Sequence, residues 1–298
     1  MKRKVIKQGN NTLTITLPKE WTENVGIKAG DELDVSEQDS AMILTTATMR
    51  KKVEKMTVDV SKLDRTSIFT LIQGLYQFGY DEINVTTGDV TAKHHRTGKD
   101  VAVAKVVHEI TNRLVGFELV SSSSKMFTIK KLTAETKEEF DVVLRRIFRL
   151  LQSMLQAFIE GVEKQNIEIL ESVEFHHVNV KKFVNYCLRL LNTFGHEHNK
   201  HTSTYFAIVQ YLSKIDDLIK NAARYIVAYK YKMTPRGVKT LQELANSLNL
   251  YYDLFYSYNL DKVRQLNSTR DRVRGGFYHS IKDLSRDDLV ILGGLMQI

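Results

Sequence analysis

The sequence has a single cysteine and only two prolines among its 298 residues. With one thiol, Cys187, the chain forms no internal disulfide, and the first residues carry no apolar signal core, so we expect a cytoplasmic protein. No apolar run approaches the roughly 20 residues that span a bilayer, and we expect no membrane insertion. Gly-rich phosphate loops, His-Glu-x-x-His helices and nucleophile elbows are also missing. These absences favour a binding protein over an enzyme.

The charged residues are unbalanced towards the basic side. Lys and Arg number 43 against 35 Asp and Glu, which gives a net charge of +8. Such an excess favours polyanionic partners, including nucleic acid. The length leaves room for two or three domains, each with a core of its own.

The first fifty residues alternate short strands with one short helix. Thr12–Leu17 has the period of two that a half-buried strand requires, and Pro18 can begin a helix over Lys19–Val25. Glu32–Val35 and Ala41–Thr45 predict a closing hairpin. This segment is too small and too poor in apolar residues to bury a core alone, so we expect it to form a homodimer through shared hairpins.

The most telling run in this segment is KQGNNTLTITLPKEWTENVGIKAGDELDV. It resembles the AbrB/MazE/SpoVT family of swapped-hairpin DNA-binding domains, and the resemblance covers nearly all of residues 3–46. It implies an N-terminal DNA-binding and dimerisation domain over residues 1–48. The family's DNA contacts come from basic residues of the first strand and its turn, and they carry over to these positions: Arg3, Lys4 and Lys7, with Gln8 and Asn10 as further base or phosphate contacts.

Charge in this domain is segregated although it sums to zero. Residues 1–50 hold seven basic and seven acidic side chains, and four of the basic ones fall within the first seven residues, ahead of every acidic one. A two-fold dimer would place two such clusters on one surface, where phosphate contacts add up. The alternative is a solvated strand face on a domain that serves only for dimerisation.

The middle of the chain, residues 49–133, alternates strands with amphipathic helices. Such alternation predicts a small α/β domain in which helices cover a sheet. Residues 88–98, with His94, His95 and Arg96, are expected to form a polar, solvated loop. A spacer and a small-ligand module both remain open as roles. The expected strands are Val53–Val60, Tyr80–Thr86 and a hairpin of Phe117–Ser121 with Lys125–Lys131, and the expected helices are Thr66–Phe78 and Val101–Leu114.

Residues 134–298 have the apolar spacing of bundled helices. The helix Tyr205–Tyr229 has apolar residues three and four apart and no internal Gly or Pro. Gly237 is expected to separate one three-helix unit from a second, whose last helix is cut short or truncated at residue 298. The other expected helices are Lys137–Lys164, Ile167–Phe194, Val238–Tyr258, Leu260–Val273 and Arg286–Ile298.

Two of these helices carry a second resemblance. The runs YLSKIDDLIKNAARYI and ILESVEFHHVNVKKFVNYCLRLLN are similar to consecutive helices of the PhoU family, which regulates phosphate uptake and signalling. The resemblance implies tandem three-helix bundles and a metal site carried over to Asp217, Asn221 and Glu174. Where the family has further carboxylates, this chain has these residues: Ser213, Arg224 and Asn179. We therefore expect at most a weakly bound metal ion.

Histidines supply the remaining candidate ligands. His196, Glu197, His198 and His201 lie in one short segment, which is either a metal site or a polar loop between helices. His177 lies on an apolar helix seam and is expected in the core or at its boundary.

Together these patterns predict a cytoplasmic, dimeric, DNA-binding regulator of phosphate uptake, whose PhoU-like helical domain senses or relays phosphate status. The signal need not be phosphate itself, since a phosphate-transporter ATPase or a signalling protein could provide it by docking on the bundle. The alternative is an adaptor that docks on such a partner and binds no DNA.

Overall fold

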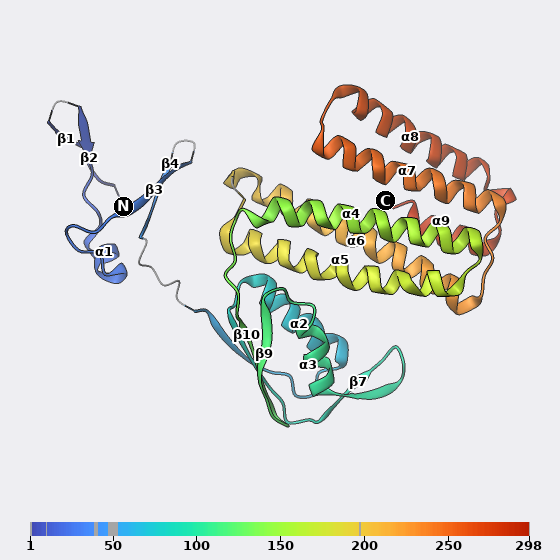
Figure 1. Cartoon of the computed structure of the whole chain (residues 1–298), viewed down its shortest axis with the longest axis horizontal. Coiled ribbons are helices and arrows are strands. Elements are labelled where there is room, and N and C mark those ends of the chain that lie inside the picture. Colours follow the sequence, from blue (N-terminus) through green and yellow to red (C-terminus); the bar gives the residue numbers. More distant parts are fainter. Residues whose placement is uncertain (1, 10, 39–40, 47–52, 197, 298) are drawn as a thin grey trace. The chain divides into compact units, whose positions relative to one another are not determined.

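A computed structural model describes residues 2–9, 11–38, 41–46, 53–196 and 198–297. It divides the chain into two compact units, Met1–Val53 and Glu54–Ile298. The first unit consists of short hairpins and one short helix, and the second combines a sheet with long helices (Figure 1).

The first unit contains two antiparallel hairpins joined through one helix. Strand β1 (Ile6–Gln8) pairs with β2 (Thr12–Thr14), and β3 (Leu33–Gln38) pairs with β4 (Ala41–Thr46). Helix α1 (Lys19–Val25) begins after Pro18 and ends at Gly26, whose φ of 77° suits a glycine. Within the described residues, the two hairpins form separate two-stranded sheets. The small N-terminal strand region of the predicted fold class is thus confirmed.

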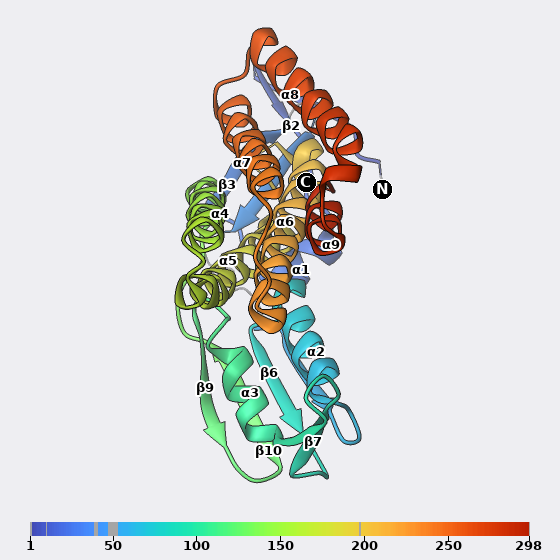
Figure 2. The same cartoon turned by 90° about the vertical axis from the view of Figure 1, so that its right-hand side faces the viewer.

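The second unit begins with a four-stranded sheet in the order β5-β6-β10-β9. Strands β5 and β6 are parallel, and β10 is antiparallel to both of its neighbours. Helices α2 and α3 lie along one face of this sheet (Figure 2), where they cover alternate residues such as Ile83 and Phe127. The bounds are β5 (Lys55–Asp59), α2 (Arg65–Phe78), β6 (Glu82–Thr86), α3 (Val103–Thr111), β9 (Phe117–Ser122) and β10 (Met126–Lys131).

The prediction of a polar loop over residues 88–98 is wrong. Strand β7 (Thr91–His94) pairs with β8 (Lys99–Ala102) in a hairpin whose turn holds His95 and Arg96. Each strand has four residues, too few for an alternating pattern to stand out, and only Ala92 is buried in β7. The pairing to β8, rather than local apolar spacing, therefore defines the strand.

Three long helices form the main part of the helical half. Helix α4 (Glu139–Lys164) packs along α5 (Ile167–Phe194), which packs along α6 (Thr202–Tyr229), side by side in Figure 1. The first connection is tight because Gln165 adopts a left-handed conformation and the Asn166 side chain caps α5. Most residues of the predicted seams are buried, although Tyr229 at the end of α6 is exposed. These side chains are among the core residues: Ile147, Met154, Phe158, Val180, Val184, Cys187, Leu212 and Ile219.

Three further helices follow: α7 (Pro235–Tyr256), α8 (Leu260–His279) and α9 (Arg286–Leu295). Gly237 does not separate two helical units, as the sequence suggested, because it lies in the first turn of α7. There it packs against Asp288 of α9, whose carboxylate atoms would be 2.7–2.9 Å from an added Cβ. The glycine is therefore required by close packing of two helices. A helical half of six helices, α4 to α9, is thus present among the described residues.

A buried arginine joins the four-stranded sheet with its helices α2 and α3, here called the sheet module, to the long helices. Arg189 of α5 is fully buried and donates to the backbone oxygen atoms of Tyr76 and Tyr80, at 3.0 and 2.7 Å. Its other nitrogens reach Asp81 at 2.8 Å and Glu135 at 2.6 Å. The charge is thus matched by two carboxylates on segments far apart in sequence, and the module and helices form one compact unit.

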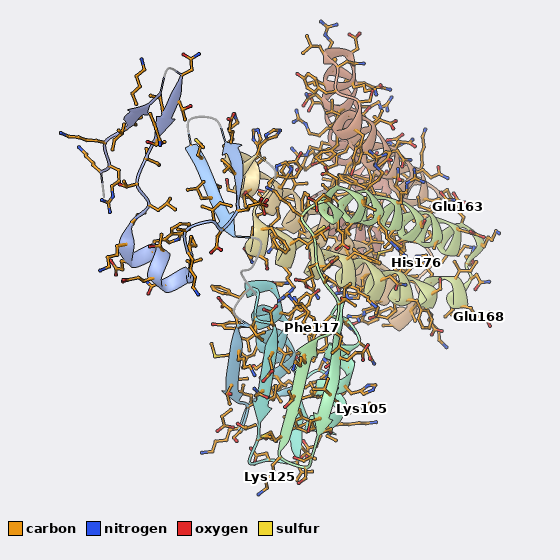
Figure 3. All side chains as sticks on the ribbon, turned by 60° about the vertical axis from the view of Figure 1, so that its left-hand side comes forward. Lys105, Phe117, Lys125, Glu163, Glu168 and His176 are labelled. Atoms are coloured by element: carbon orange, nitrogen blue, oxygen red, sulfur yellow. The ribbon has the colours of Figure 1, made fainter. Side chains whose placement is uncertain are left out.

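Aromatic rings complete this junction. The Arg189 guanidinium lies 4.7 Å from the centre of the Phe117 ring. Figure 3 shows Phe117 at the end of the sheet near the helices and Lys125 at the opposite tip of the module. Within the described residues, no helix combines the length and apolar character needed to cross a membrane.

Candidate functional site

The predicted DNA contacts lie on and before the first hairpin. Arg3 and Lys4 precede β1, and Lys7 and Gln8 lie on it; all four are exposed. Asn10 lies outside the described residues. The structure thus leaves four of the five predicted side chains accessible to a ligand.

The geometry of this hairpin limits how it can meet DNA. Lys7 pairs with Leu13 and Gln8 with Thr12, and neighbouring strand residues point to opposite faces. Lys7 and Gln8 therefore cannot both lie against one flat phosphate surface. The major groove of DNA is wide enough to admit a two-stranded ribbon of this kind.

The described residues of the first unit include apolar side chains but form no core of their own. Among its described residues, no side chain is classed as buried. Leu13 is 70% exposed and Met42 66% exposed. Four further apolar side chains are more than half exposed: Val5, Ile6, Ile15 and Val35. Exposed apolar side chains of this kind are common at contacts between protein chains.

The residues predicted to bind metal lie on α5 and α6 but have cationic partners. Asp217 is 2.8 Å from Lys181 and 2.6 Å from Lys220. Burial alone would raise the pKa of Asp217, but these two lysines outweigh it, and the pKa is lowered. The carboxylate of Asp217 is therefore already neutralised by the chain.

Glu174 and Asn221 do not converge on one ion with Asp217. Glu174 forms a two-pronged pair with Arg224, at 2.6 and 2.9 Å, and Asn221 is exposed. Burial would raise the pKa of Glu174, but Arg224 lowers it overall. Arg224 thus holds Glu174 in an ion pair between α5 and α6.

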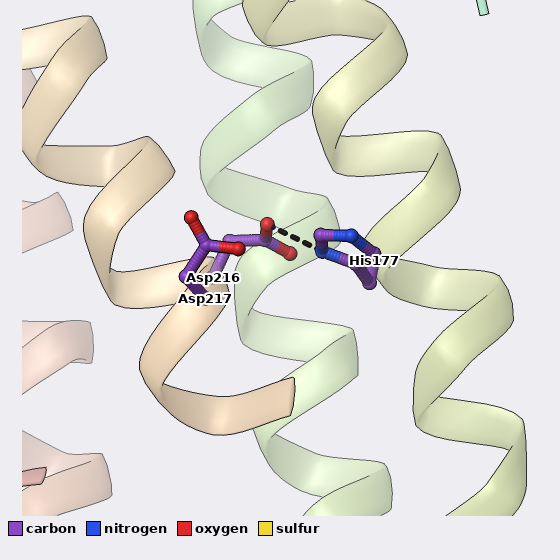
Figure 4. Close-up of side chains that lie close together, drawn as sticks. All are labelled: His177, Asp216 and Asp217. Carbon is purple, nitrogen blue, oxygen red and sulfur yellow. Dashed lines mark hydrogen bonds and ion pairs between the residues drawn. The ribbon is translucent and has the colours of Figure 1, made fainter. Parts of the chain in front are cut away.

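A different set of side chains comes together at this position. His177, Asp216 and Asp217 each offer one ligand atom within 4.8 Å of the others, the one such group of three among the described residues (Figure 4). His177 Nδ1 lies 2.7 Å from Asp216 Oδ2, and both side chains are buried. His177 is in the core, as expected, whereas the role of Asp216 was missed. The sequence feature that could have indicated Asp216 is its position one turn after Leu212, on the apolar seam of the helix.

The histidine-rich segment before α6 packs as a connection between helices. His196 is buried and stacks on Tyr205 with ring centres 4.0 Å apart. Burial lowers the pKa of His196. Glu197 lies outside the described residues. The stacked ring of His196 favours the polar-loop interpretation of this segment.

A groove of about 320 Å³ lies among α6, α7 and α8. Lys214, Arg270 and Arg274 contribute to its lining. Most other lining side chains are apolar: Leu212, Ile215, Leu218, Leu244, Leu248 and Val273. The groove thus combines a mainly apolar lining with three cationic side chains.

Comparison with known families places one part of the chain. Residues 6–53 match the family described as antidote-toxin recognition MazE, bacterial antitoxin. No curated protein and no solved structure matches the chain. The N-terminal unit is therefore a MazE/AbrB-like domain, a type that commonly forms dimers and binds DNA.

Proposed function

We propose that this protein is a DNA-binding regulator that works as a homodimer through its first unit. The observation that carries the proposal is the unit's exposed apolar surface without any buried side chain among its described residues. A second copy would cover Leu13, Ile15 and Val35, and association would then complete the missing core.

Dimerisation would also concentrate the basic residues. Each copy contributes Arg3, Lys4 and Lys7, so a dimer carries six of these cations on or just before its two β1–β2 hairpins. Lys7 lies opposite Leu13 on the face that a second copy would cover, so it would reach phosphate from the edge of that contact, while Gln8 on the other face would meet base edges. The role proposed for the protein is binding and not catalysis.

The second unit would then supply the regulatory signal, and phosphate status is the signal that we propose. The support is the likeness of the α5 and α6 sequences to PhoU helices, together with the side-by-side packing of α4, α5 and α6. The groove among α6, α7 and α8, with its apolar side chains and the cations Lys214, Arg270 and Arg274, is where a docked protein partner or an anion would deliver this signal.

The test is binding of the full chain to genomic fragments from upstream of phosphate-transport genes, at two salt concentrations. The variant Arg3→Ala/Lys4→Ala/Lys7→Ala removes six charges per dimer. The plot of log affinity against log salt should therefore become less steep by about 5. The control Lys19→Ala/Lys28→Ala removes exposed charges from the same unit away from β1 and should retain tight binding.

Binding that is tight, salt-dependent and lost only in the triple variant supports the regulator. Equal, weak binding by the wild type and both variants would instead favour the adaptor, with the first unit acting as a dimer contact. If DNA binding is strong but directed at fragments unrelated to phosphate transport, the regulator stands and the phosphate signal is wrong.

A further inference from the structure

The ammonium group of Lys181 lies among side chains of α5 and α6 that could ligate a metal ion. Lys181 Nζ is 2.8 Å from Asp217 Oδ2 and 3.5 Å from Asp216 Oδ2. It also donates to the backbone oxygen of Ser213 at 3.1 Å and to its hydroxyl at 2.5 Å. Four oxygen atoms thus surround a lysine side chain that is only 17% exposed.

The donors around this ammonium are those of a transition-metal site. His177 adds an imidazole to the two carboxylates, and Figure 4 shows the three side chains directed towards one another from α5 and α6. Asp216 is fully buried, and its Oδ1 atom has no hydrogen-bond partner among the described residues. One imidazole with two carboxylates suits Zn²⁺ or Co²⁺, whereas Mg²⁺ and Ca²⁺ prefer oxygen ligands alone.

An unpartnered buried carboxylate oxygen is costly, and a second cation would offset that cost. The ammonium stands in the way. Lys181 lies one turn after His177 on the same face of α5, so its charge is held against the donors. Lys220 contacts the Oδ1 atom of Asp217, which leaves Oδ2 as the oxygen that Lys181 uses and that a metal ion would need.

We propose that Lys181 occupies a site of transition-metal type, so that a resident ammonium joins α5 to α6 and excludes a divalent ion. The metal site implied by resemblance fits poorly because Glu174 is already paired with Arg224 and Asn221 is exposed. The site inferred here has a different donor set, His177, Asp216 and Asp217. Its present occupant is part of the chain, so its occupancy does not depend on metal supply.

The experiment titrates the full chain with Co²⁺ and follows the visible absorption of the bound ion. Lys181→Met removes the charge and keeps an apolar stem, Lys181→Gln removes the charge and keeps a hydrogen-bond donor, and Lys181→Arg keeps a cation. Both uncharged variants should bind one Co²⁺ at least about 100-fold more tightly than wild type, because one repelling charge is removed at short range. Lys181→Arg should behave like wild type.

A second substitution identifies the donors. Adding Asp216→Asn to Lys181→Met should abolish the gained binding, which separates this site from surface histidines such as His198 and His201. If Lys181→Met unfolds without metal, saturating Zn²⁺ should restore its helical circular dichroism. The proposal is overturned if both uncharged variants bind Co²⁺ no better than wild type, if Zn²⁺ rescues no unfolded variant, or if wild type binds tightly through Asp216.

Discussion

Arg189→Met should destabilise the second unit strongly, because the arginine is the charge at the centre of its junction. The substitution keeps an apolar stem but removes every hydrogen bond that Arg189 donates. These bonds go to the Asp81 and Glu135 carboxylates and to the backbone oxygen atoms of Tyr76 and Tyr80. The side chains of Asp81 and Glu135 are only 6% and 1% exposed. Water therefore cannot replace the lost partners.

The loss of unfolding free energy depends on the cation that remains beside the two carboxylates. Removing one partner of a buried ion pair costs about 3–5 kcal/mol. Lys131 stays 2.7 Å from Asp81 and 3.7 Å from Glu135, so we expect a cost near the lower limit, about 3 kcal/mol. At roughly 2–4 °C per kcal/mol for a unit of this size, Tm should fall by about 10 °C.

Thermal unfolding followed by circular dichroism of the helices measures this change. Arg224→Met is the matched control, since Arg224 also forms a two-pronged pair, with Glu174, but the two side chains are 38% and 42% exposed. An exposed pair contributes at most about 1 kcal/mol, so this Tm should fall by no more than about 4 °C. Equal Tm values for the two variants would refute the reasoning that burial gives Arg189 its weight.

Two further changes test packing and pH dependence in the same unit. Gly237→Ala should lower the unfolding free energy by about 1–3 kcal/mol in a urea titration, because its Cβ meets the buried Asp288 carboxylate. Gly276 has open space around it, so Gly276→Ala should be neutral or stabilising in the same titration. Burial would raise the pKa of Asp81, but Lys131 and Arg189 lower it overall. Its stabilising contribution is therefore present above the ordinary pKa near about 4 and is lost as pH falls through the lowered value. Unfolding free energies measured against pH should decline less steeply below about pH 4 in Asp81→Asn than in wild type; equal slopes would contradict this.

Long-range periodicity made the helices predictable. Helix α5 spans Ile167–Phe194, the range predicted from its seam and from Gly195, and α6 begins three residues before the predicted Tyr205. A helix of this length repeats its apolar spacing many times, so the pattern outweighs local exceptions. The four-residue strands β7 and β8 offer no such repetition, and only their mutual pairing defines them.

The polar groups of the second unit were harder to foresee. Arg189 lies between Leu188 and Leu190, and its partners Asp81 and Glu135 are far away in sequence, so nothing local indicates a buried ionic junction. The predicted ligand Asp217 is at the right place, but its lysine partners come from α5 and from the next turn of α6. Sequence spacing places side chains on a helical face, whereas packing against a second helix decides what they contact.

The two units should differ in how their stability depends on concentration. The described part of the first unit has no buried side chain, so folding of this unit is expected to be coupled to association. Each tenfold dilution of a dimer costs about 1.4 kcal/mol. The sole tryptophan, Trp21, lies in α1 and reports on the first unit, whereas helical circular dichroism reports mainly on the second. On dilution the Trp21 transition in urea should move to lower denaturant while the helical transition stays in place. Leu13→Lys, which charges the exposed apolar face, should lower the Trp21 transition further and remove its concentration dependence. If the Trp21 transition of wild type is independent of concentration, the first unit folds without a partner, and the proposed dimer contact is wrong.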